Sequence, residues 1–279
     1  MIKPMLAHKF DKSTINFEKQ TYIQPKLDGV RCIFTKDGAY SRAGNMFMNI
    51  KHIEKELKDY FKSNPHKILD GELYNHDLKD DFEKIISLVR KQKPTKDDVK
   101  EAKKLVQYHI YDIIEDNTLY TDRHKYLCRI FNQENFLKGS IKLVDTYPVV
   151  GLDAVEQCHK AFLKEGYEGS IIRVNGAYKP TRSWNLQKIK DFHDTEATII
   201  GYEVGKGKRK GTLGKFIMQD DNGVEFGCPP GKGYTYKDMK EMLENIDDYI
   251  GERATFTYFQ RTKAGSYRHP LFKGLRNYE

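Results

Sequence analysis

Cysteine is scarce in this sequence, and its four copies stand far apart, at Cys32, Cys128, Cys158 and Cys228. No two of them have the C-x-x-C spacing of a zinc site, and the nine histidines are equally scattered, which argues against a structural zinc centre. The pattern does not resemble the disulfide framework of a secreted domain either. The reduced cytosol is therefore the expected environment.

Uninterrupted apolar stretches are also short. No segment approaches 18 consecutive apolar residues, which a membrane helix needs. Residues 1–7 lack the apolar run of a signal peptide. We find no internal repeat and no low-complexity segment. The sequence therefore predicts a cytoplasmic globular protein that does not engage a membrane.

Positive charge is in excess over the 279 residues, with a net charge of +8 and a pI near 9.0. A hydrophobic fraction of 38% with 12% aromatics is sufficient for folded cores, and the length fits about two domains. The charge favours a polyanionic partner, with nucleic acid as the leading candidate. A basic protein that is merely soluble is the alternative.

Apolar residues recur at helical spacing in the first two thirds of the chain. They predict helices near residues 50–61, 82–89, 126–131 and 155–163. We expect Asp153 to cap the last of these helices and Gly166 to end it. The charged segment 75–105 is also expected to be helical, and no function is assigned to it.

Strand-like segments lie between these helices. Residues 30–34 and 39–42 flank Lys36-Asp37-Gly38, which predicts a β-hairpin. Further strands are predicted at residues 68–69, 106–114, 141–147, 169–174 and 186–189. Because helices and strands mix without a regular βαβ period, the expected fold class is α+β with antiparallel sheets.

The pattern changes near residue 192. Four strand-like segments follow, at residues 197–204, 213–219, 224–228 and 253–259. One helix is predicted at 235–245, where Thr235 and Asp238 form a near capping box. A small barrel of about five strands and one helix fits this tail. We therefore predict two domains, residues 1–191 and 192–279.

The sequence of residues 26–31, Lys-Leu-Asp-Gly-Val-Arg, places Lys26 at the end of a predicted strand. A lysine amine attacks phosphorus only after it loses its proton, and its ordinary pKa of about 10.4 keeps it charged at neutral pH. Nearby cations or burial lower that pKa, and Arg31 can supply a cation while holding a phosphate. Gly29 leaves room for a ligand. The ordinary alternative is a strand end followed by a turn and a surface salt bridge.

Further charged and aromatic residues follow in order along the chain. They are Arg42, Glu72, Tyr111, Glu168, Arg182, Lys188 and Lys190, and the two acids are expected at strand ends. Each one alone fits a surface ion pair, core packing or a solvated strand face. Together with a lysine nucleophile they are the groups that nucleotidyl transfer needs. Carboxylates hold Mg²⁺, cations stabilise charge on phosphate oxygens, and an aromatic ring holds a base.

These motifs in this order resemble the ATP-dependent DNA ligases of the covalent nucleotidyltransferase superfamily. The resemblance covers essentially the whole chain. It rests on the segments 26–31, 70–72, 111–112, 168–169 and 188–190, with supporting similarity at 4–7, 268–270 and 275–276. It implies a nucleotidyltransferase (adenylation) domain followed by an OB-fold domain, as in the minimal two-domain ligases of viruses and some bacteria.

The resemblance implies a three-step reaction. Lys26 attacks the α-phosphorus of ATP, forms a covalent lysyl-AMP and expels pyrophosphate. The AMP then passes to the 5′-phosphate at a nick in duplex DNA, and the neighbouring 3′-hydroxyl attacks to seal the strand. The implied setting is a monomer in the bacterial cytosol or a virus-infected host cell, acting in DNA replication, repair or recombination.

The same resemblance implies roles for individual residues. Those that would bind ATP are Gln24 (adenine), Arg31 and Arg42 (phosphate and ribose), Glu72 (ribose or metal), Tyr111 (stacking on adenine), Arg182, Lys188 and Lys190 (AMP phosphate) and Arg276 (pyrophosphate). Glu168 would hold the catalytic Mg²⁺, with Mn²⁺ as a substitute. Gln24 stands where many relatives carry an acid.

A basic loop precedes the second strand of the tail. Residues 205–215 contain five cations and no acid, namely Lys206, Lys208, Arg209, Lys210 and Lys215. We expect them to contact the DNA backbone across the nick, because phosphate neutralisation dominates affinity for duplex DNA. The alternative is a flexible, solvated loop.

Other functions share the lysine chemistry. An RNA ligase or an mRNA-capping guanylyltransferase is the enzymatic alternative, although the arginine at position 31 favours a DNA ligase. A non-enzymatic alternative is an OB-fold binding protein with a decayed nucleotide domain. That alternative predicts the loss of motif residues, whereas Lys26, Glu72, Glu168 and Lys188 are all present.

Overall fold

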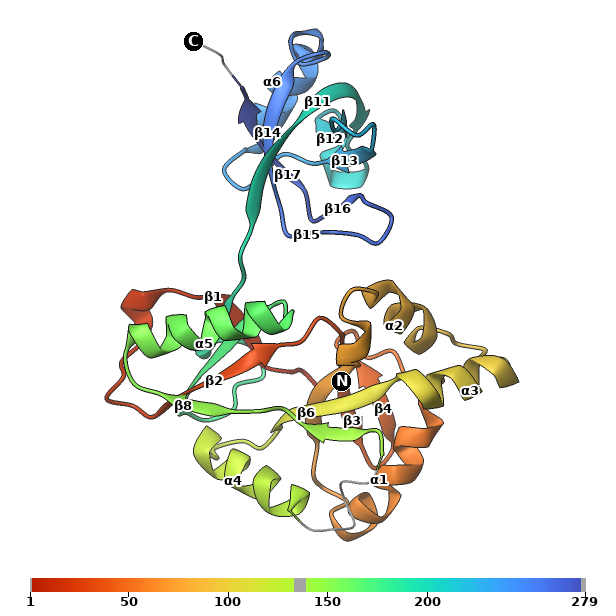
Figure 1. The fold of residues 1–279 in the computed structure, drawn as a ribbon, viewed down its shortest axis with the longest axis vertical. Helices are drawn as coiled ribbons and strands as arrows, with labels where there is room; N and C mark the ends of the chain where they lie inside the picture. The colour runs from red at the N-terminus through yellow and green to blue at the C-terminus, as the bar shows by residue number, and fades with distance from the viewer. Residues whose placement is uncertain (1, 133–138, 277–279) are drawn as a thin grey trace. The chain divides into compact units, whose positions relative to one another are not determined.

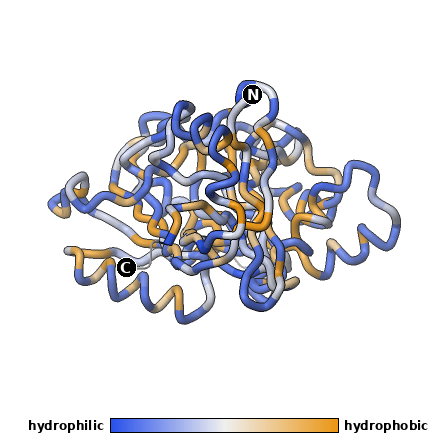
Figure 2. The backbone as a smooth tube through the Cα atoms, turned by 90° about the horizontal axis from the view of Figure 1, so that it is seen from above, coloured by the Kyte–Doolittle hydropathy of each residue, from blue (hydrophilic) through white to orange (hydrophobic). Residues whose placement is uncertain are grey.

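The structure, a computed structural model, describes residues 2–132 and 139–276 (Figure 1). Hydrophobic segments are short and alternate with hydrophilic ones along the backbone, as Figure 2 shows. The chain divides into two units, residues 1–190 and 191–279, which we describe separately.

The first unit contains two five-stranded sheets. One has the order β4-β3-β5-β6-β7 and is antiparallel except for the β6–β7 pair. Its strands are β3 (Val30–Thr35), β4 (Gly38–Ser41), β5 (Leu69–Tyr74), β6 (Gln107–Ile113) and β7 (Ile141–Leu143). The helices that contribute to its core are α1 (Lys51–Ser63), α2 (Phe82–Val89), α3 (Lys96–Leu105) and α4 (Tyr120–Phe131).

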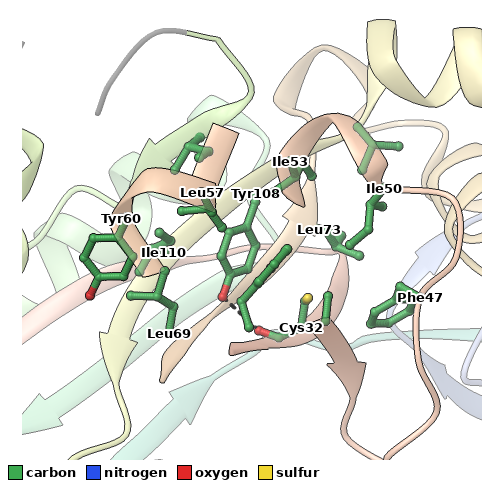
Figure 3. Packing of buried hydrophobic residues seen from close by; sticks show 14 of the residues in the cluster. Cys32, Phe47, Ile50, Ile53, Leu57, Tyr60, Leu69, Leu73, Tyr108 and Ile110 are labelled. Carbon is green, nitrogen blue, oxygen red and sulfur yellow. Dashed lines mark hydrogen bonds between the residues drawn. The ribbon is translucent and has the colours of Figure 1, made fainter. Parts of the chain in front are cut away.

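The core of this sheet is a continuous cluster of buried side chains (Figure 3). Ile53 and Leu57 of α1 belong to it together with Ile110 of β6. Tyr108 is wholly buried, and its hydroxyl donates to the carbonyl oxygen of Cys32 at 3.1 Å. Its ring therefore fills the core while its polar end keeps a partner.

The second sheet has the order β1-β10-β9-β2-β8. Its strands are β1 (Leu6–Lys9), β2 (Thr21–Lys26), β8 (Tyr147–Val149), β9 (Gly169–Val174) and β10 (Arg182–Ile189). All pairs are antiparallel except β1 with β10. The helix α5 (Leu152–Glu165) packs on this sheet through Val155 and Phe162, which cluster with Ile23 and Ile172. Two short 3₁₀ turns, η1 (Lys12–Thr14) and η2 (His76–Leu78), complete the unit.

The second unit is built on one antiparallel sheet with the order β13-β12-β11-β14-β17. Its strands are β11 (His193–Val204), β12 (Leu213–Gln219), β13 (Glu225–Cys228), β14 (Arg253–Tyr258) and β17 (Leu271–Leu275), with β15 (Gln260–Arg261) and β16 (Tyr267–Arg268) forming a separate hairpin. The helix α6 (Tyr236–Glu244) begins with the expected capping box of Thr235 and Asp238. The 3₁₀ turns are η3 (Gly207–Arg209) and η4 (Ile246–Asp248). The α+β class with antiparallel sheets is confirmed.

Several local predictions need correction. Asp153 does not cap α5, because the helix begins after Gly151, whose positive φ of 88° turns the chain, and Asp153 lies in the first turn. Gly166 does end α5, in the left-handed conformation that favours glycine. The predicted strand 141–147 is two strands, β7 and β8, which belong to different sheets. Glu72 lies inside β5 and not at a strand end.

No helix in the described ranges is long and apolar enough to cross a membrane.

Candidate active site

Three neighbouring strands bring the predicted lysines and Glu168 together. Lys26 is the last residue of β2 and pairs in register with Gly169, the first residue of β9. The amide of Glu168 donates to the carbonyl of Lys26 at 3.1 Å. At Gly169, where φ is +152°, a Cβ would overlap the carbonyl oxygen of Ile189 in β10. Only glycine permits this close approach of β9 and β10. The approach brings Lys190, the residue after β10, next to Glu168.

Glu168 bridges two of these lysines. Its carboxylate pairs with Lys26 through one oxygen and with Lys190 through the other, the latter at 2.6 Å. Burial alone would raise the pKa of Glu168, but the two cations outweigh it and hold that pKa below its ordinary value. Burial lowers the pKa of Lys188, and the Lys26 cation lowers it further. The candidate nucleophile, Lys26, is thus held in an ion pair with Glu168.

A cavity of about 280 Å³ opens beside Lys26. Eight predicted residues line it, namely Gln24, Lys26, Arg31, Arg42, Glu72, Tyr111, Arg182 and Lys188. Glu168 and Lys190 adjoin it through the Lys26 ion pair. The volume lies near the lower end of the range for small-molecule pockets. The cavity therefore combines a lysine, one carboxyl group, an aromatic ring and several cations.

Glu72 has an unusual ionisation among these residues. Burial raises its pKa to about 8, although Lys26 and Arg31 both act to lower it. Its carboxyl group accepts a hydrogen bond from the Tyr111 hydroxyl at 3.4 Å. A carboxyl group with a raised pKa favours a neutral state until a cation approaches it.

Hydrogen bonds to Asp70 and Met5 hold Arg31 in place. It donates to both carboxylate oxygens of Asp70, at 2.9 and 2.6 Å, and to the carbonyl of Met5 at 2.7 Å. The Tyr178 hydroxyl donates to the same carboxylate at 2.8 Å. Arg31 thus ties the N-terminal segment to β5 along one wall of the cavity.

A buried polar network that the sequence pattern did not indicate lies under the cavity. Arg173, 4% exposed, lines the cavity and donates to Asp112 at 2.7 Å and to the side-chain oxygen of Gln24 at 2.6 Å. Arg123 donates to Asp112 from the other side, at 2.7 and 3.1 Å. Tyr120 accepts a hydrogen bond from the Gln24 amide at 3.1 Å and lies 4.8 Å from the Arg173 guanidinium. The network fixes the orientation of the Gln24 amide.

The remaining predicted residues belong to the second unit. Arg276 forms an ion pair with Glu196. Lys215 forms one with Glu203 at 3.0 Å. The loop cations are exposed, and none of them enters an ion pair with another described residue; they are Lys206, Lys208, Arg209 and Lys210.

Two models of known protein families match the chain. The model described as "ATP dependent DNA ligase domain" matches residues 4–190, which is more than half of the sequence. The chain belongs to the ATP-dependent DNA ligase family. A second model, described as "DNA ligase OB-like domain", matches residues 204–276. The assignment of an OB fold to the tail of this ligase-family chain is therefore confirmed.

Individual ligases show how far this similarity extends. The DNA ligase of African swine fever virus is 31% identical over 264 residues, which cover 88% of this chain and 60% of the viral protein. The DNA ligase of Enterobacteria phage T4 is 25% identical over 303 residues, covering 89% of this chain and 62% of the phage protein. This ligase-family chain thus spans about 60% of the length of these curated relatives.

Solved ligase structures share the fold. A Lig E DNA ligase superposes with a TM-score of 0.81 at 23% identity, covering 99% of this chain and 100% of that one. Chlorella virus DNA ligase-adenylate superposes with a TM-score of 0.53 at 25% identity, covering both chains completely. These likenesses confirm an adenylation-type domain followed by an OB-fold domain.

The acidic side chains near Lys26 can be compared with the ligands that a divalent metal ion needs. Within the described residues, no three His, Cys, Asp or Glu side chains are grouped closely enough to hold a metal ion among themselves. Glu72 and Glu168 lie close enough for the charge on one to raise the pKa of the other. Mg²⁺ in nucleotide enzymes is commonly held by one or two carboxylates together with substrate phosphates. The two glutamates therefore fit Mg²⁺ that arrives with a nucleotide.

Proposed function

We propose that this chain is an ATP-dependent DNA ligase that seals nicks in duplex DNA through a lysyl-AMP intermediate. The observation that carries the proposal is the ion pair of Lys26 with Glu168 at the wall of a cation-lined cavity. Membership in the ligase family supports the reaction type. The DNA ligases of African swine fever virus and phage T4 extend beyond the matched region, so the activity is proposed for the part that aligns.

In the first step the Lys26 amine, once deprotonated, forms a P–N bond to the α-phosphorus of ATP. The bond from that phosphorus to the bridging oxygen breaks, and pyrophosphate leaves with the electron pair. Lys188, Arg182 and Lys190 supply positive charge for the phosphate oxygens, which is the main electrostatic requirement of this step. Tyr111 offers its ring to the adenine, and Gln24 offers its fixed amide.

The two glutamates are the proposed ligands of a divalent metal ion. Glu72 and Glu168 would hold Mg²⁺, or Mn²⁺ in its place, and such an ion shields the negative charge of the phosphates when bound. Because burial raises the pKa of Glu72 to about 8, binding of the ion would also release a proton near neutral pH.

The second and third steps require nicked duplex DNA. AMP passes from Lys26 to the 5′-phosphate, and the 3′-hydroxyl then displaces AMP to form the phosphodiester bond. Charge supports this partner, since residues 1–190 contain 34 Lys and Arg against 26 Asp and Glu. Residues 191–279 contain 14 of each, and five of those cations lie in residues 206–215. We propose that the basic loop contacts the DNA backbone and that the protein acts as a cytoplasmic monomer.

A labelling experiment tests the proposal. Protein incubated with Mg²⁺ and [α-³²P]ATP should acquire label, and chasing with a 5′-phosphorylated nicked DNA duplex should transfer the label and join the strands. Lys26→Ala should remove labelling, and Lys164→Ala, which changes an exposed lysine of α5, should not. Labelling of Lys26→Ala at the normal level would refute the assignment of the nucleophile. Labelling by GTP and not by ATP would favour a capping guanylyltransferase, and preferential joining of nicked RNA would favour an RNA ligase.

A further inference from the structure

The only tryptophan of the sequence lies exposed on the second sheet of the first unit. Trp184, in β10, is 46% exposed. Its ring lies flat against His8 of β1, with ring centroids 3.8 Å apart and planes inclined by only 4°. A large flat aromatic surface left open to solvent has an energetic cost, so it points to an unassigned contact.

A bulge in β10 produces this exposure. Leu6 and Ala7 pair with Arg182 and Ser183, but the next residue of β1, His8, pairs with Gln187. Residues 184–186 therefore have no partner on β1. Bulges of this kind re-aim side chains and occur preferentially beside active sites.

Buried hydrogen bonds hold the bulge in place. Gln187 is wholly buried, and its amide nitrogen donates to the carbonyl of Trp184 at 3.1 Å and to the Thr14 hydroxyl at 3.0 Å. Its side-chain oxygen accepts from the amide of Asp11 at 3.0 Å. The backbone that carries Trp184 is thus fixed by a satisfied polar group, and the stack on His8 fixes the ring.

The stack lies at the rim of the nucleotide cavity. Ala7 and Arg182, which precede His8 and Trp184 on their strands, both line that cavity, as do Leu186 and Lys188. The surroundings are strongly basic, because residues 3–12 and 179–190 contain seven Lys and Arg and one acid. That acid, Asp11, is engaged in capping η1.

The cations around the stack are available to a ligand. Within residues 2–132 and 139–276, no ion pair engages Lys9, Lys12, Lys179, Arg182 or Lys188. Arg182 donates a hydrogen bond to the carbonyl of Ala7, which leaves its charge uncompensated. An aromatic face surrounded by uncompensated cations matches single-stranded or locally opened nucleic acid, whose bases stack on aromatic rings while its phosphates are neutralised.

From this placement we propose that His8 and Trp184 form a stacking platform for a deoxyribose or base of the DNA strand next to the nick. This inference rests on the proposed function and assigns part of its DNA site. The rigid ring contributes contact area at a low entropic cost. The neighbouring cations hold the flanking phosphates. The platform would position the broken strand end at the rim of the cavity that contains the adenylate.

The single tryptophan makes the platform directly observable. Titration of the unlabelled protein with nicked duplex DNA should change the tryptophan emission and reduce quenching by acrylamide, because a stacked DNA residue would cover the exposed face. ATP with Mg²⁺ alone should leave acrylamide quenching unchanged. Protection by ATP alone would assign the stack to the nucleotide and overturn the proposal, as would saturating DNA binding without protection.

Variants give a second, independent measurement. Trp184→Ala should weaken binding of nicked DNA about 5- to 100-fold, as removal of one stacking aromatic does, while lysyl-AMP formation stays near normal. Trp184→Phe should recover part of the affinity. The matched control is Tyr147→Ala on β8, because Tyr147 is also 46% exposed and lies at the opposite edge of the same sheet.

The outcomes separate this inference from the proposed function. If the unaltered protein forms lysyl-AMP and seals nicks but Trp184→Ala binds DNA as tightly as Tyr147→Ala, the platform is wrong and the ligase assignment stands. If the unaltered protein neither labels with ATP nor joins strands, the proposed function itself fails. Equal thermal unfolding of the two variants ensures that a loss of affinity reports the contact and not misfolding.

Discussion

Replacement of Asp112 by alanine tests whether the buried network under the cavity carries the stability of the first unit. Asp112 is wholly buried and receives hydrogen bonds from both Arg123 and Arg173, which are 1% and 4% exposed. Asp112→Ala would leave two buried guanidinium groups without their carboxylate. Removing one partner of a buried ion pair typically costs about 3–5 kcal/mol, because the remaining charge is uncompensated.

The expected shift in melting temperature follows from that cost. For a chain of this size, about 1 kcal/mol lowers the melting temperature by roughly 2–4 °C, so Asp112→Ala should lower it by about 6–20 °C. Differential scanning calorimetry of the ligand-free protein measures the shift. Asp153→Ala, which changes an exposed acid in the first turn of α5, is the control and should shift it little.

Arg123→Met should be milder, because Asp112 then keeps its ion pair with Arg173. A melting temperature for Asp112→Ala within about 2 °C of the unaltered protein would refute the reasoning, since it would mean that the two guanidinium groups find water or other acceptors at little cost.

Three further predictions concern the site and the loop. Burial raises the pKa of Glu72 to about 8 from an ordinary 4.5, so the folded state holds a proton that the unfolded chain releases. The stability of the ligand-free protein should therefore fall by up to about 1.4 kcal/mol per pH unit between pH 5 and 8, and Glu72→Gln should flatten that slope in urea titrations. An unchanged slope in Glu72→Gln would contradict this. Gly169→Ala should slow lysyl-AMP formation at least about tenfold in a single-turnover assay. The added Cβ would overlap the carbonyl oxygen of Ile189, push β9 away from β10 and so displace Glu168. A normal rate would count against the close approach of the two strands. The loop variant replaces four cations by neutral residues, namely Lys206, Lys208, Arg209 and Lys210. It should bind nicked DNA more weakly and with a flatter salt dependence, while lysyl-AMP formation stays near normal. Unchanged sealing at moderate salt would contradict a role of the loop in DNA binding.

Local patterns explain what the sequence predicted correctly. The β-branched apolar residues within 169–174 and the turn signal at Lys36-Asp37-Gly38 are properties of a few adjacent residues, and the structure has β9 and the β3–β4 hairpin there. The position of Lys26 at the end of β2 likewise depends on the apolar residues just before it. Gly166 ends α5 because a left-handed residue is required at that point, whatever the rest of the fold.

Long-range pairing explains what the sequence did not predict. Arg173 lies in a correctly predicted strand, but a cation in a strand ordinarily faces solvent. Its burial depends on Asp112, 61 residues away, and on Gln24, 149 residues away. The same holds for Trp184, whose exposure depends on a register shift between β10 and β1 at the opposite end of the domain sequence. The Tyr-Asp sequence at 111–112 contained a signal, because an acid inside an apolar strand requires a buried partner.

The position of Lys26 in its sheet limits how far the AMP bound to it could move during turnover. The strand that ends in this lysine pairs with β8 through Thr21–Ile23 and with β9 as far as Lys26, so β9 holds the main chain at Lys26 while the side-chain torsions can change. In the proposed reaction the activated AMP would therefore travel no farther than one lysine side chain can swing. The broken end of the DNA would have to be delivered to within that reach of Lys26.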